Sequence, residues 1–318
     1  MTISDAVETF LDGYFSTCRR SPKTHAAYKI DLAQLKDFNS TAELATIKAD
    51  ALERWAMDLR TKKYASASIR RKFATAKVFF SYWVRKGAIE SSPLWRLRLD
   101  LGRERILPRS LTPGDAKALI ESAWNGVALV ELSGKPGDAG FLRLRNMAAI
   151  EILFATGMRV GELVRLNLLD WNETDGSFLI NGKGARQRLG FLPDDRSLAA
   201  VKAYVGSRQK VPVAVEALFL NAAGRPITTQ GIARMLALEA KTAGVAVRVT
   251  PHMIRHTVAT LLLRFGADIR IVQEVLGHAS IATTQRYTHV SKEHMLSTLR
   301  ARHPSHHLNI NMVVKQAS

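Results

Sequence analysis

Near the end of the chain, residues 250–256 read Thr250-Pro251-His252-Met253-Ile254-Arg255-His256. Thr250 is a good helix cap, and a proline directly after the cap is typical of a first helical turn. His252 and Arg255 are three residues apart, so both side chains would project from that turn, where free backbone N–H groups favour an anion. The segment therefore predicts a helix that begins with a phosphate-binding corner.

Two more short helices are expected after this one. Asp268 can cap the first of them, which would end at Gly277, and Ser280 can start the second. Together the three helices would bring four polar side chains towards one place: His252, Arg255, His278 and Tyr287.

Size and charge narrow the possible functions. A chain of 318 residues exceeds the usual size of a single core, which predicts two domains. The net charge of +18 indicates a polyanionic partner, for which nucleic acid is the natural candidate. A membrane surface could attract the same charge, but the sequence has no apolar run of membrane-spanning length and no signal-peptide pattern, so a soluble, cytoplasmic protein is expected. Cys18 is the single cysteine, which excludes an intrachain disulfide and a cysteine-based zinc site.

The first part of the chain reads as a bundle of about four helices. Between Arg60 and Lys86 lie nine basic residues and no acidic one. The simple alternative is a solvated helix face, but such faces usually mix both signs, so we expect phosphate contacts that are largely independent of DNA sequence. The expected DNA-binding residues are Arg60, Lys62, Lys63, Arg70, Arg71, Lys72 and Lys77. The aromatic residues nearby are expected in the core: Phe73, Phe79, Phe80 and Trp83.

The second part begins after a basic linker, residues 91–108. The glycine-rich segment from Gly126 to Gly140 is expected to be a surface excursion. Further on, Arg159 lies between two glycines at a helix junction, where an arginine can approach an anion. Residues 177–180 and 189–192 change to a strand pattern, and the Asn-Gly pair between them predicts a hairpin with Lys183 at its tip.

Taken together, these residues resemble the tyrosine recombinase family, which includes the phage integrases and Xer-type recombinases. The resemblance is carried by Ala-Thr-Gly-Met-Arg ending at Arg159, Gly-Lys-Gly around Lys183, His252-x-x-Arg255-His, Leu-Gly-His278 and Tyr287-Thr-His. It implies a mainly α fold with a small β-sheet in two domains, an α-helical core-binding bundle and an α+β catalytic domain. The expected boundaries are 1–90 for the DNA-binding bundle, 91–108 for the linker, 109–305 for the catalytic domain and 306–318 for a tail.

The resemblance also implies a site-specific recombinase or integrase that works through a 3′-phosphotyrosine and a Holliday junction, without cofactor or metal. Tyr287 would be the nucleophile, and Arg159 and Arg255 would bind the phosphate. Lys183 would protonate the leaving oxygen, and His252 and His278 would transfer protons or hydrogen-bond the phosphate. Glu162 would support the site. The implied partners are duplex DNA carrying a recombination site, further copies of the chain as a synaptic tetramer, and a partner recombinase or accessory DNA-bending proteins.

Two other functions fit the same residues: a type IB-like topoisomerase, and a catalytically silent DNA-binding accessory protein. At the end of the chain, His303, His306 and His307 are expected in a solvated tail rather than a metal site. The apolar residues after them could instead dock into a neighbouring subunit: Leu308, Ile310, Met312, Val313 and Val314.

Overall fold

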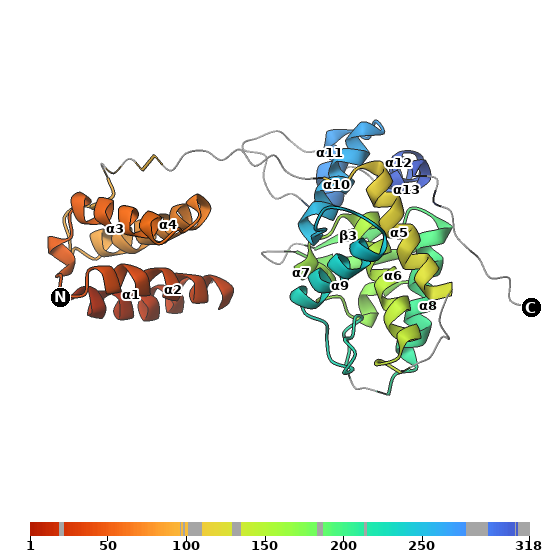
Figure 1. The fold of residues 1–318 in the computed structure, drawn as a ribbon, viewed down its shortest axis with the longest axis horizontal. Coiled ribbons are helices and arrows are strands. Elements are labelled where there is room, and N and C mark those ends of the chain that lie inside the picture. Colours follow the sequence, from red (N-terminus) through yellow and green to blue (C-terminus); the bar gives the residue numbers. More distant parts are fainter. Residues whose placement is uncertain are drawn as a thin grey trace, which may run out of the picture. The chain divides into compact units, whose positions relative to one another are not determined.

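The computed structural model describes residues 1–18, 22–95, 97, 99–100, 110–128, 135–182, 187–212, 215–277, 292–308 and 310. Two compact units divide the chain, Met1–Ile106 and Leu107–Ser318, and each has a hydrophobic core of its own. Helices dominate both units (Figure 1). The predicted fold class, mainly α with a small β-sheet, is confirmed. Within the described ranges, no helix has the length and apolar content needed to span a membrane.

The first unit confirms the predicted helical bundle. Thr2 caps the first helix by accepting a hydrogen bond from the backbone N–H of Asp5 at 3.1 Å, and Ile3, Val7 and Phe10 follow at helical spacing on its buried face. The described elements of this unit are α1 (Ile3–Thr17), α2 (Pro22–Phe38), η1 (Leu44–Thr46), α3 (Ala49–Thr61) and α4 (Ser66–Arg85).

Aromatic side chains form much of the core of the first unit. Phe10 meets Phe79 edge to face, with 5.4 Å between ring centroids, and Trp55 packs on Phe73 at 4.8 Å. The predicted core positions are confirmed, since all four are at most 7% exposed: Phe73, Phe79, Phe80 and Trp83.

A buried carboxylate, Asp31, joins α2 to α4. It accepts hydrogen bonds from Lys72 at 3.1 Å, Arg71 at 2.8 Å and the Thr75 hydroxyl at 3.0 Å. The Lys72 side chain is only 2% exposed, so the prediction that it contacts DNA is wrong. The basic run between Arg60 and Lys86 therefore has a negative counter-charge, Asp31, on another helix. The other six residues of the predicted set are exposed: Arg60, Lys62, Lys63, Arg70, Arg71 and Lys77.

Replacing Asp31 by asparagine is expected to destabilise the first unit by about 3 kcal/mol, because Lys72 would keep a buried charge without its counter-ion. Urea unfolding monitored by tryptophan fluorescence would measure this change. Asp50→Asn is the matched control: its ion pair with Arg54 is exposed, at 65% and 64% of the two side chains, and its loss is expected to destabilise the unit far less than the loss of Asp31. Equal effects of the two substitutions would contradict the assignment.

In the second unit, α6 is the central element. It is buried along almost its whole length because it is apolar on nearly every face, and it packs against α5, α8, α10 and β3 (Figure 1). The described elements are α5 (Pro113–Ala128), α6 (Ala139–Thr156), α7 (Val160–Leu163), η2 (Leu168–Asp170), β1 (Trp171–Asn172), β2 (Ser177–Asn181), β3 (Gln187–Phe191), α8 (Asp195–Gln209), α9 (Thr229–Thr242), α10 (Pro251–Arg264), α11 (Ile269–Leu276), α12 (Lys292–Arg302) and α13 (Pro304–His307).

The strands form an antiparallel sheet in the order β1-β2-β3. Asn181 lies opposite Gln187 and Ile180 opposite Arg188, so the two predicted strands of the hairpin are confirmed. Lys183, expected at the hairpin tip, lies outside the described residues.

One local prediction is corrected. Gly126 lies inside α5 and Gly140 inside the first turn of α6, so the surface excursion expected from Gly126 to Gly140 is shorter than its glycines indicated. The reason is that the flanking apolar residues extend both helices into the glycine-rich segment. Thr228, directly before α9, caps this helix by accepting a hydrogen bond from the Gly231 backbone N–H.

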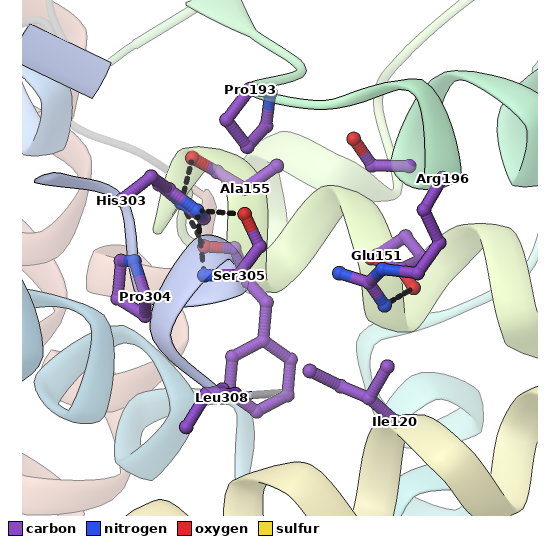
Figure 2. A pocket seen from close by; sticks show the side chains of 11 residues that line it. Ile120, Glu151, Ala155, Pro193, Arg196, His303, Pro304, Ser305 and Leu308 are labelled. Carbon is purple, nitrogen blue, oxygen red and sulfur yellow. Dashed lines mark hydrogen bonds and ion pairs between the residues drawn. The ribbon is translucent and has the colours of Figure 1, made fainter. Parts of the chain in front are cut away.

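The predicted solvated tail is wrong at His303. This side chain is 1% exposed, and its Nε2 lies 3.2 Å from the carbonyl oxygens of both Phe154 and Ala155, in the last turn of α6. Its Nδ1 lies 3.2 Å from the Ser305 backbone N–H. Nε2 therefore carries the proton and Nδ1 accepts. Figure 2 shows the imidazole against the end of α6, in a small cavity that also borders Arg196.

The residues after His303 also pack onto their own unit. Leu308 is 5% exposed and belongs to its core, and Ile310 packs against that core. For these two residues the alternative of docking into a neighbouring subunit is therefore not supported. Met312, Val313 and Val314 lie outside the described residues.

Docking of α13 is expected to weaken in acid, because burial lowers the pKa of His303 to about 4. Above about pH 6.5 the imidazole is neutral whether docked or undocked, so its titration does not change docking there. Between about pH 6.5 and 4 only the undocked imidazole gains a proton, so each unit of falling pH disfavours docking by up to ~1.4 kcal/mol. Hydrogen exchange of residues 303–308 would measure the change.

His303→Phe provides the control for this pH dependence. It removes the titrating group while leaving Asp194, Glu151, Arg196 and His306 around the site. The difference between wild type and variant therefore isolates the imidazole. Protection that is independent of pH in the wild type would contradict the account.

Candidate active site

The site begins where α6 ends. Gly157 follows the helix in the left-handed conformation, with φ +56°, and its N–H bonds the Leu153 carbonyl. This turn frees the Gly157 carbonyl for a partner outside the helix and leads directly to Arg159, the N-terminal cap residue of α7. The end of α6 thus supplies both an acceptor and a cation to one corner.

Arg255 reaches this corner from α10. Thr250 caps that helix and Pro251 occupies its first turn, as predicted. The Arg255 guanidinium donates from Nη1 to the Gly157 carbonyl and from Nη2 to the Leu276 carbonyl, each at 2.8 Å. Burial, followed by the nearby charge of Arg159, lowers the pKa of Arg255 to about 10, so the side chain remains a cation at neutral pH.

Glu162 is the buried acid of the corner, with a side chain 2% exposed. Its Oε1 accepts from Arg159 Nη1 at 2.9 Å, and its Oε2 accepts from the Arg159 backbone N–H at 2.9 Å and from Arg188 Nη2 at 2.9 Å. Burial alone would raise the pKa of this carboxyl, but the hydrogen bonds from Arg188 and Arg159 outweigh it and lower the pKa. The predicted supporting role of Glu162 therefore has a defined geometry: it holds two guanidinium groups.

Arg188 was not among the predicted site residues. It lies on β3 opposite Ile180 and also donates from Nε to the Val275 carbonyl at 3.2 Å. A usable signal was present, because strand alternation puts Arg188 on the same face as the buried Gly190. An arginine on the buried face of a strand needs an anionic or carbonyl partner.

The structure brings together only some of the predicted site residues. Arg159, Arg255 and Glu162 meet at the corner, and His252 is exposed on the first turn of α10. Lys183, His278 and Tyr287 lie outside the described residues. The Gly277 carbonyl, one residue before His278, lies 3.5 Å from Arg159 Nη2.

Comparison with known proteins agrees with this fold. Residues 7–87 match the phage integrase N-terminal SAM-like domain, and residues 128–294 match the phage integrase family. The chain therefore belongs to the phage integrase family, and like the tyrosine recombinases of that family it is an enzyme that cleaves and rejoins DNA strands.

Individual relatives match over nearly the full chain. A tyrosine recombinase of Agathobacter rectalis is 32% identical over 302 residues, covering 94% of this chain and 97% of the relative. Tyrosine recombinase XerC of Roseiflexus sp. (strain RS-1) is 36% identical over 324 residues, covering 99% and 97%. Among solved structures, the Tn1549 transposon integrase in complex with circular intermediate DNA has a TM-score of 0.71 at 18% identity, covering 88% of this chain and 93% of that one.

Replacing Gly157 by alanine is expected to disturb the corner, because the new Cβ would lie 2.5 Å from Leu276 Cδ2 at a backbone φ of +56°. Gly244→Ala is the matched control, with a φ of +72° and open space around the Cβ. Both changes incur roughly 1 kcal/mol of left-handed strain, but the steric overlap at Gly157 is expected to add about 1–3 kcal/mol. Thermal unfolding would compare them, and equal losses would contradict the described packing.

Proposed function

We propose that this recombinase acts at a specific duplex DNA site, with Arg159 and Arg255 binding the scissile phosphate and Tyr287 attacking it. The observation that supports the phosphate site is an excess of positive charge. Three guanidinium groups gather at the corner, and their described ion pairs all go to one carboxylate, that of Glu162. A bound phosphate would relieve the repulsion between Arg159 and Arg255, and their forked donors suit its non-bridging oxygens.

In the proposed cleavage step, the Tyr287 oxygen forms a bond to phosphorus while the bond from phosphorus to the 5′-oxygen breaks. The product is a 3′-phosphotyrosine and a free 5′-hydroxyl. Phosphate ester character is retained, so a 5′-hydroxyl from another strand can attack in the reverse step and restore the DNA backbone. Arg159 and Arg255 stabilise the charge that grows on the non-bridging oxygens in the pentavalent transition state.

Proton transfer is assigned to the remaining residues of the family pattern. His252 accepts the phenolic proton, and Lys183 donates a proton to the leaving 5′-oxygen. His278 hydrogen-bonds the phosphate. The exposure of His252 on the first turn of α10 is compatible with access to a substrate.

The proposed assembly is a synaptic tetramer, because recombination between two duplexes requires four strand cleavages, one for each subunit, with a Holliday junction between the two pairs of exchanges. Residues 1–90 form a DNA-binding domain, 91–108 a linker and 109–305 the catalytic domain. The six exposed basic residues between Arg60 and Lys77 would contact DNA phosphates. A partner recombinase or DNA-bending proteins would assist on the DNA, and the site of action would be the cytoplasmic nucleoid.

Replacing Tyr287 by phenylalanine is expected to abolish covalent capture of DNA while leaving site binding intact. The substrate is a duplex that the protein selects from a random pool, prepared as a series with a nick stepped through the site. Cleavage beside the nick releases a short fragment, so rejoining fails and the adduct accumulates on a denaturing gel.

Tyr64→Phe, the same change at an exposed tyrosine of the first unit, is the control and should still form the adduct. An adduct that persists in Tyr287→Phe would exclude this nucleophile. No adduct from wild-type protein on any nicked duplex that it binds would reject the cleavage mechanism. Relaxed plasmid without recombinants, in a two-site plasmid assay, would favour topoisomerase activity over recombination.

A further inference from the structure

Arg188 links three parts of the second unit through one side chain. Its Nη2 donates to Glu162 at 2.9 Å and its Nε donates to the Val275 carbonyl at 3.2 Å, while its backbone belongs to β3. Only 12% of the side chain is exposed. The guanidinium is therefore a fixed part of the corner rather than a mobile surface cation.

The contact with Glu162 determines the charge of the corner. Glu162 carries one negative charge and also binds Arg159. With Arg188 present, three guanidinium charges and one carboxylate charge leave an excess of two positive charges. Without Arg188 the excess falls to one, because Glu162 would then offset half of the charge that Arg159 and Arg255 supply. A phosphodiester carries one negative charge before attack and approaches two in the pentavalent state, so this lost charge matters most in the transition state.

The contact with Val275 determines the position of the end of α11 relative to Arg188. Val275 lies in the last turn of α11, and Gly277 ends that helix with φ +63°. A Cβ at Gly277 would lie 2.9 Å from Arg188 Cδ, so the alkyl part of Arg188 occupies the space beside this glycine. Arg188 thus connects the strand that follows Lys183 in the sequence to the helix end that precedes His278.

We propose that Arg188 is a positioning residue of the recombinase: it neutralises Glu162 so that Arg159 and Arg255 direct their full charge at the phosphate, and it fixes the end of α11 against β3. The proposal rests on the proposed phosphate site. Loss of a purely structural arginine would slow cleavage of charged and uncharged substrates equally. Neutralisation of Glu162 instead predicts that the loss of rate without Arg188 depends on the charge of the substrate.

The test measures the rate of covalent adduct formation on the selected nicked duplex, with either a normal phosphodiester or a methylphosphonate at the scissile position. The methylphosphonate replaces one non-bridging oxygen by a methyl group and removes one negative charge. Arg188→Met is expected to slow cleavage of the phosphodiester roughly 100-fold, with affinity for the site changed less than about threefold. On the methylphosphonate the loss is expected to shrink to less than about tenfold.

Glu162→Gln combined with Arg188→Met tests neutralisation directly. The double variant restores an excess of two positive charges, so it is expected to cleave the phosphodiester at least about tenfold faster than Arg188→Met alone. Arg188→Lys retains the charge but cannot span both acceptors, so its rate is expected between those of wild type and Arg188→Met.

Arg196→Met is the matched control for structural loss. Arg196 pairs with the buried Glu151 in the same unit, and the two side chains are 11% and 2% exposed, against 12% and 2% for Arg188 and Glu162. Any loss of cleavage rate in Arg196→Met is expected to be the same on the phosphodiester and on the methylphosphonate. Thermal unfolding of every variant would identify any that are not folded. If Arg188→Met is unfolded, the double variant decides the question by comparison with wild type, because its phosphodiester rate is then expected to lie within about tenfold of the wild-type rate.

Two results would overturn the inference alone: wild-type rates in Arg188→Met, or equal losses on both substrates without recovery in the double variant. No adduct from wild-type protein on duplexes that it binds would instead reject the proposed function, and this inference with it. The two failures are therefore distinguishable.

Discussion

The corner where Arg159, Arg188 and Arg255 meet depends on the buried carboxylate of Glu162. Its oxygens accept hydrogen bonds from Arg159, at the start of α7, and from Arg188, on β3. The carboxylate therefore joins two segments that are separate in the sequence. A buried carboxylate loses far more by desolvation than an exposed one and stays ionised only with such partners. As long as Glu162 is charged, α7 and β3 must stay together, and Arg188 extends the connection to the end of α11.

The end of α6 is held from two directions. On one side, His303 caps the carbonyls of its last turn. On the other, the left-handed turn at Gly157 presents the next free carbonyl to Arg255. The chain after α12 is therefore packed against the helix whose end carries the proposed phosphate site. The first unit contains a comparable buried acid, Asp31, but its partners Arg71 and Lys72 belong to a single helix, so that cluster joins two helices of a bundle and stabilises them rather than building an exposed anion site.

The structural elements that depend on local sequence patterns could be predicted from the sequence. Caps and helical spacing identified α10, and strand alternation identified the hairpin. The short sequence motifs around Arg159 and Arg255 identified the cations of the corner. It failed where a partner comes from a distant segment. Lys72 looked like part of a DNA-binding face because Asp31 is 41 residues away in the chain. His303 looked solvated because its acceptors lie in α6, and Arg188 was missed because its importance depends on strand register and on two acceptors from other elements.

The arginines held by Glu162 and by the neighbouring carbonyls are proposed to form the phosphate site of the recombinase. The most direct measurement is a crystal structure of the protein on its selected nicked duplex with orthovanadate in place of the scissile phosphate. We expect vanadate with the Tyr287 oxygen at one apex, and with Arg159 and Arg255 each within about 3.2 Å of an equatorial oxygen. Vanadate held by other residues, with both arginines still directed only at Glu162 and the carbonyls of Gly157 and Leu276, would contradict it.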